Sequence, residues 1–218
     1  MTYEEIRQDK AIHTYIAQAD ASLSALGFTE HSFAHVTHVA AMAGYLLETL
    51  GYDAHTVELA KIAGYLHDIG NLVNRIEHSQ SGAVMAFQIL TSLGFGAEDV
   101  ATIVTAIGNH DEGTGQPVSA FAAALILADK SDVRRSRVRD KATVALDIHD
   151  RVNYSVTDCH LEFDEQHTSI RLILTVDTEL GSVMEYLEIF MKRMLLCQKA
   201  AQALGLTFHL VINGQLLV

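Results

Sequence analysis

The sequence predicts a mainly α-helical protein: a helical bundle over residues 1–150, followed by a small α+β extension over residues 151–218. Two observations predict this division. Before residue 150, apolar residues recur at helical spacing, with Gly94, Gly96 and the loop 113–117 as interruptions. After residue 150, apolar and polar residues alternate as they do in half-buried strands.

The extension is predicted to contain strands over 151–157, 159–163 and 169–176. Ser182 and Glu185 then form the pattern of a capping box, which predicts the start of a helix that Gly205 can end. Asn213-Gly214, between the apolar runs 206–212 and 215–218, predicts a tight hairpin. The apolar face of the helix, which we expect in the core, consists of Met184, Leu187, Met191, Met194 and Leu195.

Three arrangements of this extension are open. It packs on the helical part, it pairs with a second subunit to form a homodimer, or it forms one wall of a substrate cleft.

Composition limits the classes of function. The chain has 218 residues, 49% of them hydrophobic, which is enough to bury a sizeable core. The net charge of −12 argues against a nucleic-acid duplex or an anionic membrane as a partner. We expect no membrane-spanning segment and no signal peptide. Cys159 and Cys197 have no metal-binding spacing, and two such cysteines fit a cytoplasmic protein.

His67 and Asp68 close the apolar run 59–66. Because that run offers a helix no polar face, both side chains should point inward. A buried ionised carboxylate is unfavourable unless a partner or a metal ion compensates its charge. We therefore interpret His67-Asp68 as a pair of metal ligands.

Other chemistry-bearing side chains occur at the ends or on the apolar stripes of further predicted helices. His35 is in helical register with the apolar residues 39, 42, 46 and 50. Asp129 ends the apolar segment 120–128, and His110 follows the stripe 100, 103, 104 and 107. His78 precedes a helix that is expected to start near Ser79 or Ser81. A bundle can bring such helix ends together inside an apolar shell.

The ordinary explanation for one buried histidine is a hydrogen bond to a carbonyl in the core. That explanation would have to hold separately for each of His35, His67, Asp68 and Asp129. The presence of all four at inward-facing positions favours a metal site instead. The histidines of polar or irregular stretches, His31 among them, need no special explanation.

The order His35, His67-Asp68, Asp129, with the local strings HVTHVA, LHDIG and LADK, resembles the HD superfamily of metal-dependent phosphohydrolases. The resemblance covers about residues 30–140 and implies that these four side chains bind a metal ion. His78 and His110 are similar to the additional histidines of dinuclear members, such as the symmetrical diadenosine tetraphosphate hydrolases and the HD-GYP phosphodiesterases. Many relatives carry Lys directly after LHDIG, whereas this chain has Asn71.

Two imidazoles and two carboxylates suit one or two divalent ions such as Fe, Mn, Co, Ni or Zn, with Mg a poorer match. A bound cation can activate water and polarise a phosphoryl oxygen. If His78 and His110 hold a second ion, Asp68 can bridge the two. Asp111 is then either a general base or a carboxylate that orients His110, and a plain solvated loop acid is the alternative.

Lys130, Arg134 and Arg137 lie in the most basic segment of the chain, directly after Asp129. Arginine binds phosphate oxygens in bidentate fashion, so we expect these side chains to hold a substrate phosphate. Arg134 and Arg137 would share one side if the helix continues. The alternative is a solvated helical face paired with Asp132 and Asp140. His38, three residues after His35, either orients a ligand, touches substrate or packs in the core.

The expected function is metal-dependent hydrolysis of a phosphate ester or anhydride in a nucleotide or another small phosphorylated molecule. One alternative is a di-iron oxygenase of HD type, since the order His35, His67-Asp68, His78, His110, Asp129 also satisfies that ligand set. The other is a non-catalytic sensor that binds a nucleotide or a metal.

Overall fold

The computed structural model describes residues 1–139, 144 and 147–218 of the chain. Asp140, one of the two acids considered as partners of the arginine segment, lies outside these residues. The N-terminal part consists of helices and short 3₁₀ turns: α1 (Tyr3–Gln8), α2 (Lys10–Ala25), α3 (Phe33–Thr49), α4 (Ala54–Leu66), η1 (Ile69–Leu72), α5 (His78–Ser92), α6 (Ala97–Gly108), α7 (Ala120–Lys130) and η2 (Arg135–Arg137). The C-terminal part follows with α8 (Ile148–Ser155), β1 (Val156–Phe163), β2 (Ser169–Val176), α9 (Val183–Ala203), β3 (Thr207–Ile212) and β4 (Gln215–Leu216).

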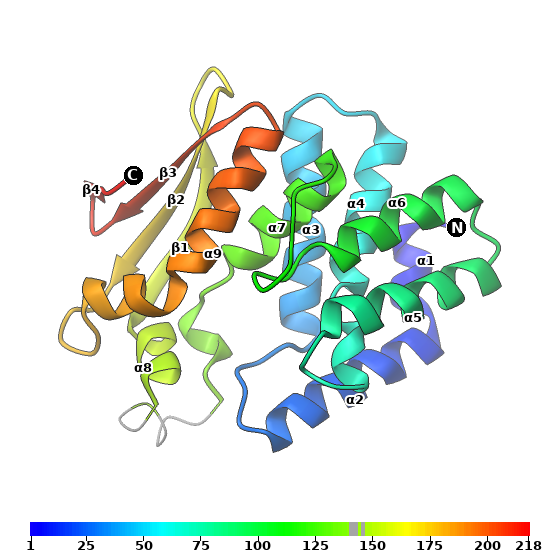
Figure 1. Ribbon diagram of the computed structural model, residues 1–218, viewed down its shortest axis with the longest axis horizontal. Helices are drawn as coiled ribbons and strands as arrows, with labels where there is room; N and C mark the ends of the chain where they lie inside the picture. Colours follow the sequence, from blue (N-terminus) through cyan, green and yellow to red (C-terminus); the bar gives the residue numbers. More distant parts are fainter. Residues whose placement is uncertain (140–143, 145–146) are drawn as a thin grey trace.

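Helices α3 and α7 lie at the centre of the molecule, and α4 packs against both (Figure 1). Side-chain caps fix where several of these helices begin: Asp9 for α2, Ser32 for α3, Asp53 for α4 and Ser119 for α7. Every residue of α7 from Ala122 to Lys130 is buried, which explains its continuous apolar sequence. The predicted helical bundle is thus confirmed.

The C-terminal part is a mixed four-stranded sheet in the order β1-β2-β3-β4. β1 and β2 are antiparallel, β2 and β3 are parallel, and β4 pairs antiparallel with β3. Helix α9 makes the crossover between the parallel strands and lies between the sheet and α7 (Figure 1). The buried side chains of both parts form one continuous hydrophobic core.

Of the three arrangements considered for the extension, the structure shows packing on the helical part through α9 and α7. The boundary at residue 150 stays a prediction. The hairpin is confirmed, because Asn213 and Gly214 both have positive φ, at 51° and 77°. The capping box of Ser182 and Glu185 at the start of α9 is also confirmed.

Two predictions of local structure were wrong. Residues 151–155 belong to helix α8, which Asp147 caps through the backbone amides of His149 and Asp150, and the strand begins only at Val156. Over so few residues, one face of a short helix and one face of a strand give a similar pattern. The start of helix α5, predicted near Ser79 or Ser81, lies at His78, after Glu77 in the left-handed region at φ 56°.

The second wrong prediction is the buried face of α9, of which Met194 is buried as expected and other members are exposed. Met184 is 75% exposed and Met191 44% exposed, whereas Tyr186, Phe190 and Cys197 are buried. Helix α9 has apolar side chains on more than one face. The face that carries the aromatic rings is the one that packs between α7 and the sheet.

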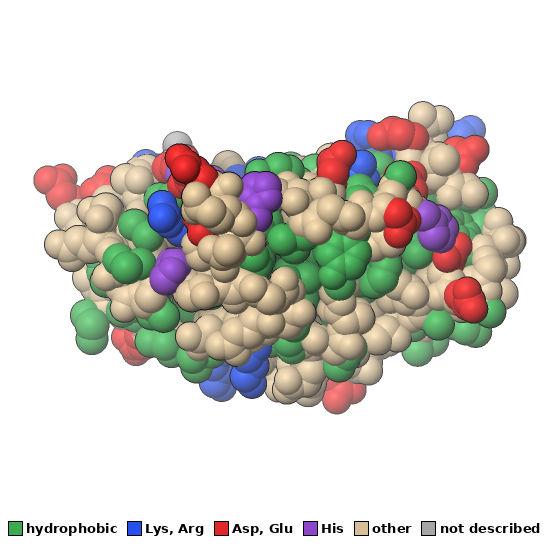
Figure 2. All heavy atoms as spheres, turned by 90° about the horizontal axis from the view of Figure 1, so that it is seen from above, with side chains coloured by type: hydrophobic (Ala, Val, Ile, Leu, Met, Phe, Trp, Pro, Cys, Tyr) green, Lys and Arg blue, Asp and Glu red, His purple; other side chains and the backbone are tan. Residues whose placement is uncertain are grey.

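Figure 2 shows one face of the molecule, on which acidic side chains lie around a central group of hydrophobic ones.

Within the described part of the chain, no helix combines the length and apolarity needed to cross a bilayer.

Candidate metal centre

Six side chains converge where several helices of the bundle meet. His35 comes from the first turn of α3, His67 and Asp68 follow α4, and His78 opens α5. The other two are His110, just after α6, and Asp129, in the last turn of α7. All six are buried, with at most 8% of any residue exposed.

Two glycines let the backbones approach closely enough for this convergence. A Cβ atom on Gly64 of α4 would lie 2.7 Å from the Cα of Ala40 in α3. A Cβ on Gly70, in η1, would lie 2.0 Å from the carbonyl oxygen of His78. Only glycine avoids these contacts with backbone atoms, so Gly64 brings His67 toward α3 and Gly70 brings α5 against η1.

The first group of side chains surrounds the two inner carboxylates. Nε2 of His35 is 3.3 Å from Oδ1 of Asp129 and 3.6 Å from Oδ2 of Asp68. Nε2 of His67 is 3.3 Å from Oδ2 of Asp68 and 3.7 Å from Oδ1 of Asp129. The imidazole nitrogens and carboxylate oxygens therefore face a common point.

The second group lies on the other side of Asp68. Nε2 of His78 is 3.4 Å from Oδ1 of Asp68 and 3.2 Å from Nε2 of His110. Asp111 lies at its rim, with Oδ1 4.0 Å from Nε2 of His78. Asp68 thus turns one oxygen to His35 and His67 and the other to His78, so that it would be able to hold a cation together with either group.

In each of the four histidines, Nδ1 already has a hydrogen-bond acceptor. His35 donates to Oδ2 of Asp132 over 2.7 Å. The other three donate to carbonyl oxygens: His67 to Gly64, His78 to Arg75 and His110 to Ile107. These bonds turn each Nε2 toward the centre, where its lone pair would be available to a metal once the imidazole is neutral.

The buried centre also contains unsatisfied polar atoms. Among the residues that the structure describes, Nε2 of His35, Nε2 of His67 and Oδ2 of Asp68 have no hydrogen-bond partner. Such atoms are unfavourable in a protein interior unless a ligand pairs with them. His35, His67 and Asp129 form one group that can hold a metal ion, and His67, Asp68 and His110 form another. The donor set therefore fits a divalent cation.

The charges in the centre act strongly on one another. Burial would raise the pKa of Asp68, but His67 and His31 hold it well below its usual range. Burial lowers the pKa of His67, yet Asp68 and Asp129 outweigh burial and raise it to about 10. Burial also keeps the pKa of His110 well below its usual value. The negative charge of Asp68 and Asp129 thus favours positive charge at this point, and a bound metal cation would stabilise the two carboxylates in the same way as a protonated histidine.

The sequence matches the HD domain family over residues 32–155, a range that includes all six side chains. The chain belongs to the HD domain family. Its HD domain contains a buried His/Asp cluster that can hold a metal.

The chain is also similar to individual proteins. The chain is 26% identical over 211 residues to an uncharacterized protein of Methanocaldococcus jannaschii, a match that covers 86% of this chain and 81% of the relative. It is also similar to the ribonucleases Y of Lawsonia intracellularis, at 33% identity over 48% of the chain, and of Latilactobacillus sakei, at 30% over 64%. The matches span only 18% and 27% of those two enzymes.

A crystal structure of a predicted HD superfamily hydrolase from an uncultured Thermotogales bacterium aligns at 24% identity and a TM-score of 0.47. That alignment covers 62% of this chain and 75% of that one.

The basic side chains expected to hold phosphate have different surroundings in the HD domain. Nζ of Lys130 is buried and lies 2.8 Å from Asp129 and 2.6 Å from Glu112. Helix α7 ends at Lys130, so Arg134 and Arg137 do not share the face of a continued helix, because the chain leaves α7 in an extended stretch before η2. Arg137 is buried and donates to the carbonyl oxygens of Glu30 and Asp132.

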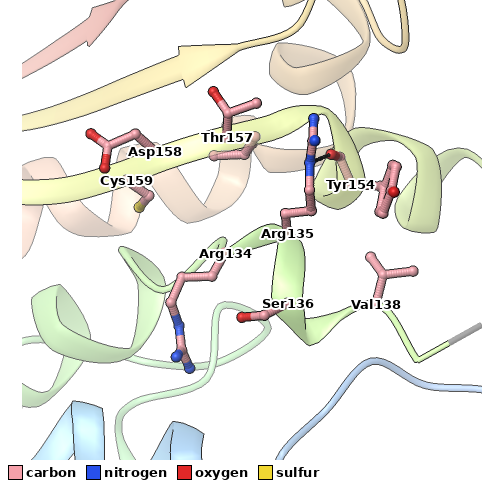
Figure 3. Close-up of a pocket in the computed structure, with 9 residues that line it drawn as sticks. Arg134, Arg135, Ser136, Val138, Tyr154, Thr157, Asp158 and Cys159 are labelled. Atoms are coloured by element: carbon pink, nitrogen blue, oxygen red, sulfur yellow. Dashed lines mark hydrogen bonds between the residues drawn. The ribbon is translucent and has the colours of Figure 1, made fainter. Parts of the chain in front are cut away.

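Arg134 donates from Nε and Nη2 to the carboxylate of Asp132, over 2.5 and 3.0 Å. It lines a cavity of about 670 Å³ between η2 and β1, together with Arg135, Ser136 and Cys159. The Arg134 and Arg135 side chains point in opposite directions there (Figure 3). His38 is half-buried on α3, and burial lowers its pKa while the charge of Asp132 raises it. Phosphate binding by these side chains stays a prediction.

Sequence reasoning missed several contributors to the HD centre. Asp132 orients His35, whereas from the sequence Asp132 was considered only as a partner of the arginines. His31 packs edge-on against His35, with ring centroids 5.5 Å apart. Nη1 of Arg75 lies 3.9 Å from Oδ1 of Asp68. Asn71, noted only as a departure from Lys, donates to Oδ1 of Asp68 over 2.9 Å. The only pattern in the sequence that pointed to Asp132 was its position three residues after Asp129. No pattern in the sequence pointed to His31 or Arg75.

Proposed function

We propose that this protein hydrolyses a phosphate ester or anhydride in a small phosphorylated molecule, such as a nucleotide, at the six-residue centre. One observation carries the proposal. Four Nε2 atoms and two carboxylates face one another at 3.2–3.7 Å in a buried site, while the Nδ1 atoms of the same histidines are all engaged elsewhere. This arrangement suits cation binding better than core packing.

A divalent cation bound there supplies Lewis acidity, which lowers the pKa of a bound water and polarises a phosphoryl oxygen. The side chains supply position and proton transfer. Asp68 lies between the two histidine groups and is held by the amide of Asn71. Asp111 is partly exposed at the rim, where Oδ1 can accept the proton of an attacking water.

Arg75 is the cation best placed to receive the phosphoryl group. Its Nη1 is 3.9 Å from Asp68 and 3.4 Å from Nε2 of His78, and its guanidinium lies over the ring of Phe28 at 5.8 Å. Its side chain is 27% exposed, so a ligand can reach it. A guanidinium in this place can bind two phosphate oxygens and neutralise charge that develops on them.

The relatives support a phosphate substrate without identifying it. Two of the similar proteins are named ribonucleases, and an enzyme that cuts RNA acts on a phosphodiester. The net charge of −12 favours a small substrate over a nucleic-acid duplex.

The test combines elemental analysis of the purified protein with a screen of phosphorylated metabolites, nucleotides, diesters and symmetrical dinucleoside polyphosphates. We expect about one or two equivalents of Fe, Mn, Co, Ni or Zn and turnover of at least one phosphate compound. Asp68→Ala should abolish turnover and most metal binding while the far-ultraviolet circular dichroism stays helical. Asp158→Ala, an exposed carboxylate on β1, is the matched control and should change neither. Full activity in the Asp68 variant would refute the mechanism.

A second candidate function keeps the centre and changes the reaction. All six side chains of the order expected for a di-iron oxygenase converge in the structure, which favours this alternative over other non-hydrolytic ones. Two irons with an oxygen-sensitive mixed-valence electron paramagnetic resonance signal would support oxidation. Turnover of a phosphate compound with a redox-inert ion would support hydrolysis. Ligand binding without any turnover would instead indicate a sensor.

A further inference from the structure

A cleft of about 390 Å³ lies beside the candidate metal centre, between the helical part and the C-terminal extension. The helical part contributes Phe28, His31 and Arg75 to its lining. Helix α9 of the extension contributes Phe190 and Arg193. One wall of the cleft therefore comes from a helix outside residues 32–155, the range that matches the HD family.

Arg193 is tied to the centre through a short series of ion pairs. Lys130 lies between Asp129 and Glu112, at 2.8 and 2.6 Å. Nη2 of Arg193 then lies 3.6 Å from Oε1 of Glu112. The guanidinium stacks over the Phe190 ring, 4.5 Å from its centroid. Burial lowers the pKa of Arg193, but the charges of Glu112 and Asp129 raise it, so the group stays a cation.

The hydrogen-bonding capacity of this cation is largely unused. The contact with Glu112 is longer than a hydrogen bond, and Lys130 is the closer partner of that carboxylate. Nε of Arg193 is buried and has no hydrogen-bond partner within the described part of the chain. Only 18% of the side chain is exposed, so water satisfies little of it. A buried guanidinium with free N–H groups is unfavourable unless a ligand supplies acceptor oxygens.

Other side chains lie between Arg193 and the metal centre, whereas Arg75 lies directly beside it. Arg75 lies within 3.9 Å of Asp68, whereas Lys130 and Glu112 stand between Arg193 and Asp129. Arg137, the third guanidinium of the cleft, is bound to backbone carbonyls. Two arginines on different elements therefore remain for a ligand, one beside the centre and one farther along the cleft.

We propose that Arg193 of the C-terminal helix binds a second anionic group of the substrate, distinct from the phosphoryl group that reacts beside Arg75. This inference rests on the proposed function and makes it more specific. The substrate is then a compound with at least two acidic groups, such as a pyrophosphate or a bisphosphate, and the extension is part of the substrate site.

The test measures binding of inorganic phosphate and of pyrophosphate to the metal-loaded full-length protein by calorimetry; if the protein cleaves pyrophosphate, the non-hydrolysable methylenediphosphonate takes its place, so that the readout does not depend on turnover. Wild-type protein should bind pyrophosphate more tightly than phosphate. Arg193→Gln should weaken pyrophosphate binding by about tenfold or more, as expected for a lost charge-assisted hydrogen bond, and leave phosphate binding within about twofold. Lys192→Gln removes an exposed charge from the neighbouring position and should alter neither affinity. Metal content is measured after each titration to exclude stripping by pyrophosphate.

If Arg193→Gln does not fold, Arg193→Lys replaces it, because lysine keeps the charge but loses the bidentate geometry; pyrophosphate binding alone should weaken. Unchanged binding of both anions, an equal loss for both, or loss of metal would overturn the inference while leaving hydrolysis in place. Wild-type protein that binds pyrophosphate no better than phosphate would also contradict it. Protein that binds neither anion and hydrolyses no phosphate compound would overturn the proposed function as well.

Discussion

Asp132 accepts a hydrogen bond from Nδ1 of His35 over 2.7 Å, and the same carboxylate receives the guanidinium of Arg134. The Asp132 side chain is fully buried, and His35 and Arg137 keep its pKa far below the usual value although burial would raise it. Asp132 therefore fixes the ring of His35 with Nε2 directed at Asp68 and Asp129.

The first prediction concerns this orientation. Asp132→Asn keeps the shape of the side chain but removes the charge that favours Nδ1 as the donor. We expect metal affinity to fall by about 10- to 100-fold, as for other residues that orient metal-bound histidines, with the helical signal unchanged. Titration of the apoprotein with Mn²⁺ or Zn²⁺ measures the change. Asp158→Asn on the exposed side of β1 is the control, and equal affinities in both variants would contradict the role of Asp132.

Much of the candidate centre could be predicted from the sequence, because helical register alone decides which way a side chain on an apolar stripe points. His35 shares its stripe with buried Val39 and Leu46, and Asp129 lies in the last turn of a helix whose residues are all buried from Ala122 onward. His67 and Asp68 follow a helix whose last residues are all buried. The burial of these side chains therefore follows from local pattern.

The remaining parts depend on tertiary contacts that local pattern does not contain. His31 and Arg75 lie in irregular segments, and they approach Asp68 only because those segments fold back over the centre. Helix α9 has several apolar side chains on different faces, so its buried face, and with it the position of Arg193, depends on how α7 and the sheet enclose it. For α8, the eight residues are too few to separate helical from strand periodicity.

A second prediction tests the close approach of η1 and α5. In Gly70→Ala the new Cβ would lie 2.0 Å from the carbonyl oxygen of His78 and 2.4 Å from the amide nitrogen of Gly82, both backbone atoms. Helix α5 must then shift, so we expect a loss of about 1–3 kcal/mol in the free energy of unfolding and weaker binding at the His78 side of the centre. Urea denaturation and metal stoichiometry measure these effects. Gly96→Ala meets no atom within 4 Å and should be nearly neutral.

A third prediction concerns the two thiols. Burial raises the pKa of Cys159 and of Cys197 to about 12, from a usual value of 9.0. Because the thiolate is the reactive form, both cysteines should resist iodoacetamide in the native protein up to pH 9 and above. In urea, where the ordinary pKa returns, both should react readily at pH 9. Mass spectrometry counts the modified thiols, and rapid native labelling at pH 8 would contradict this picture.

The last prediction concerns Lys130, which was expected from the sequence to hold phosphate but lies buried between Asp129 and Glu112. Both carboxylates raise its pKa above the usual value although burial lowers it, so the ammonium is a permanent counter-charge. Lys130→Met leaves the buried Asp129 without its cation and the partly exposed Glu112 with the more distant Arg193, and we expect the apoprotein to lose about 3–5 kcal/mol in the free energy of unfolding. Because a bound cation would then be the remaining partner of Asp129, added Mn²⁺ should stabilise this variant more than the wild type in urea denaturation. The double variant Lys130→Met/Glu112→Gln removes one of the stranded charges and should recover part of the loss. An apoprotein as stable as the wild type would show that Lys130 does not neutralise the centre, and would return it to the role of a free phosphate ligand.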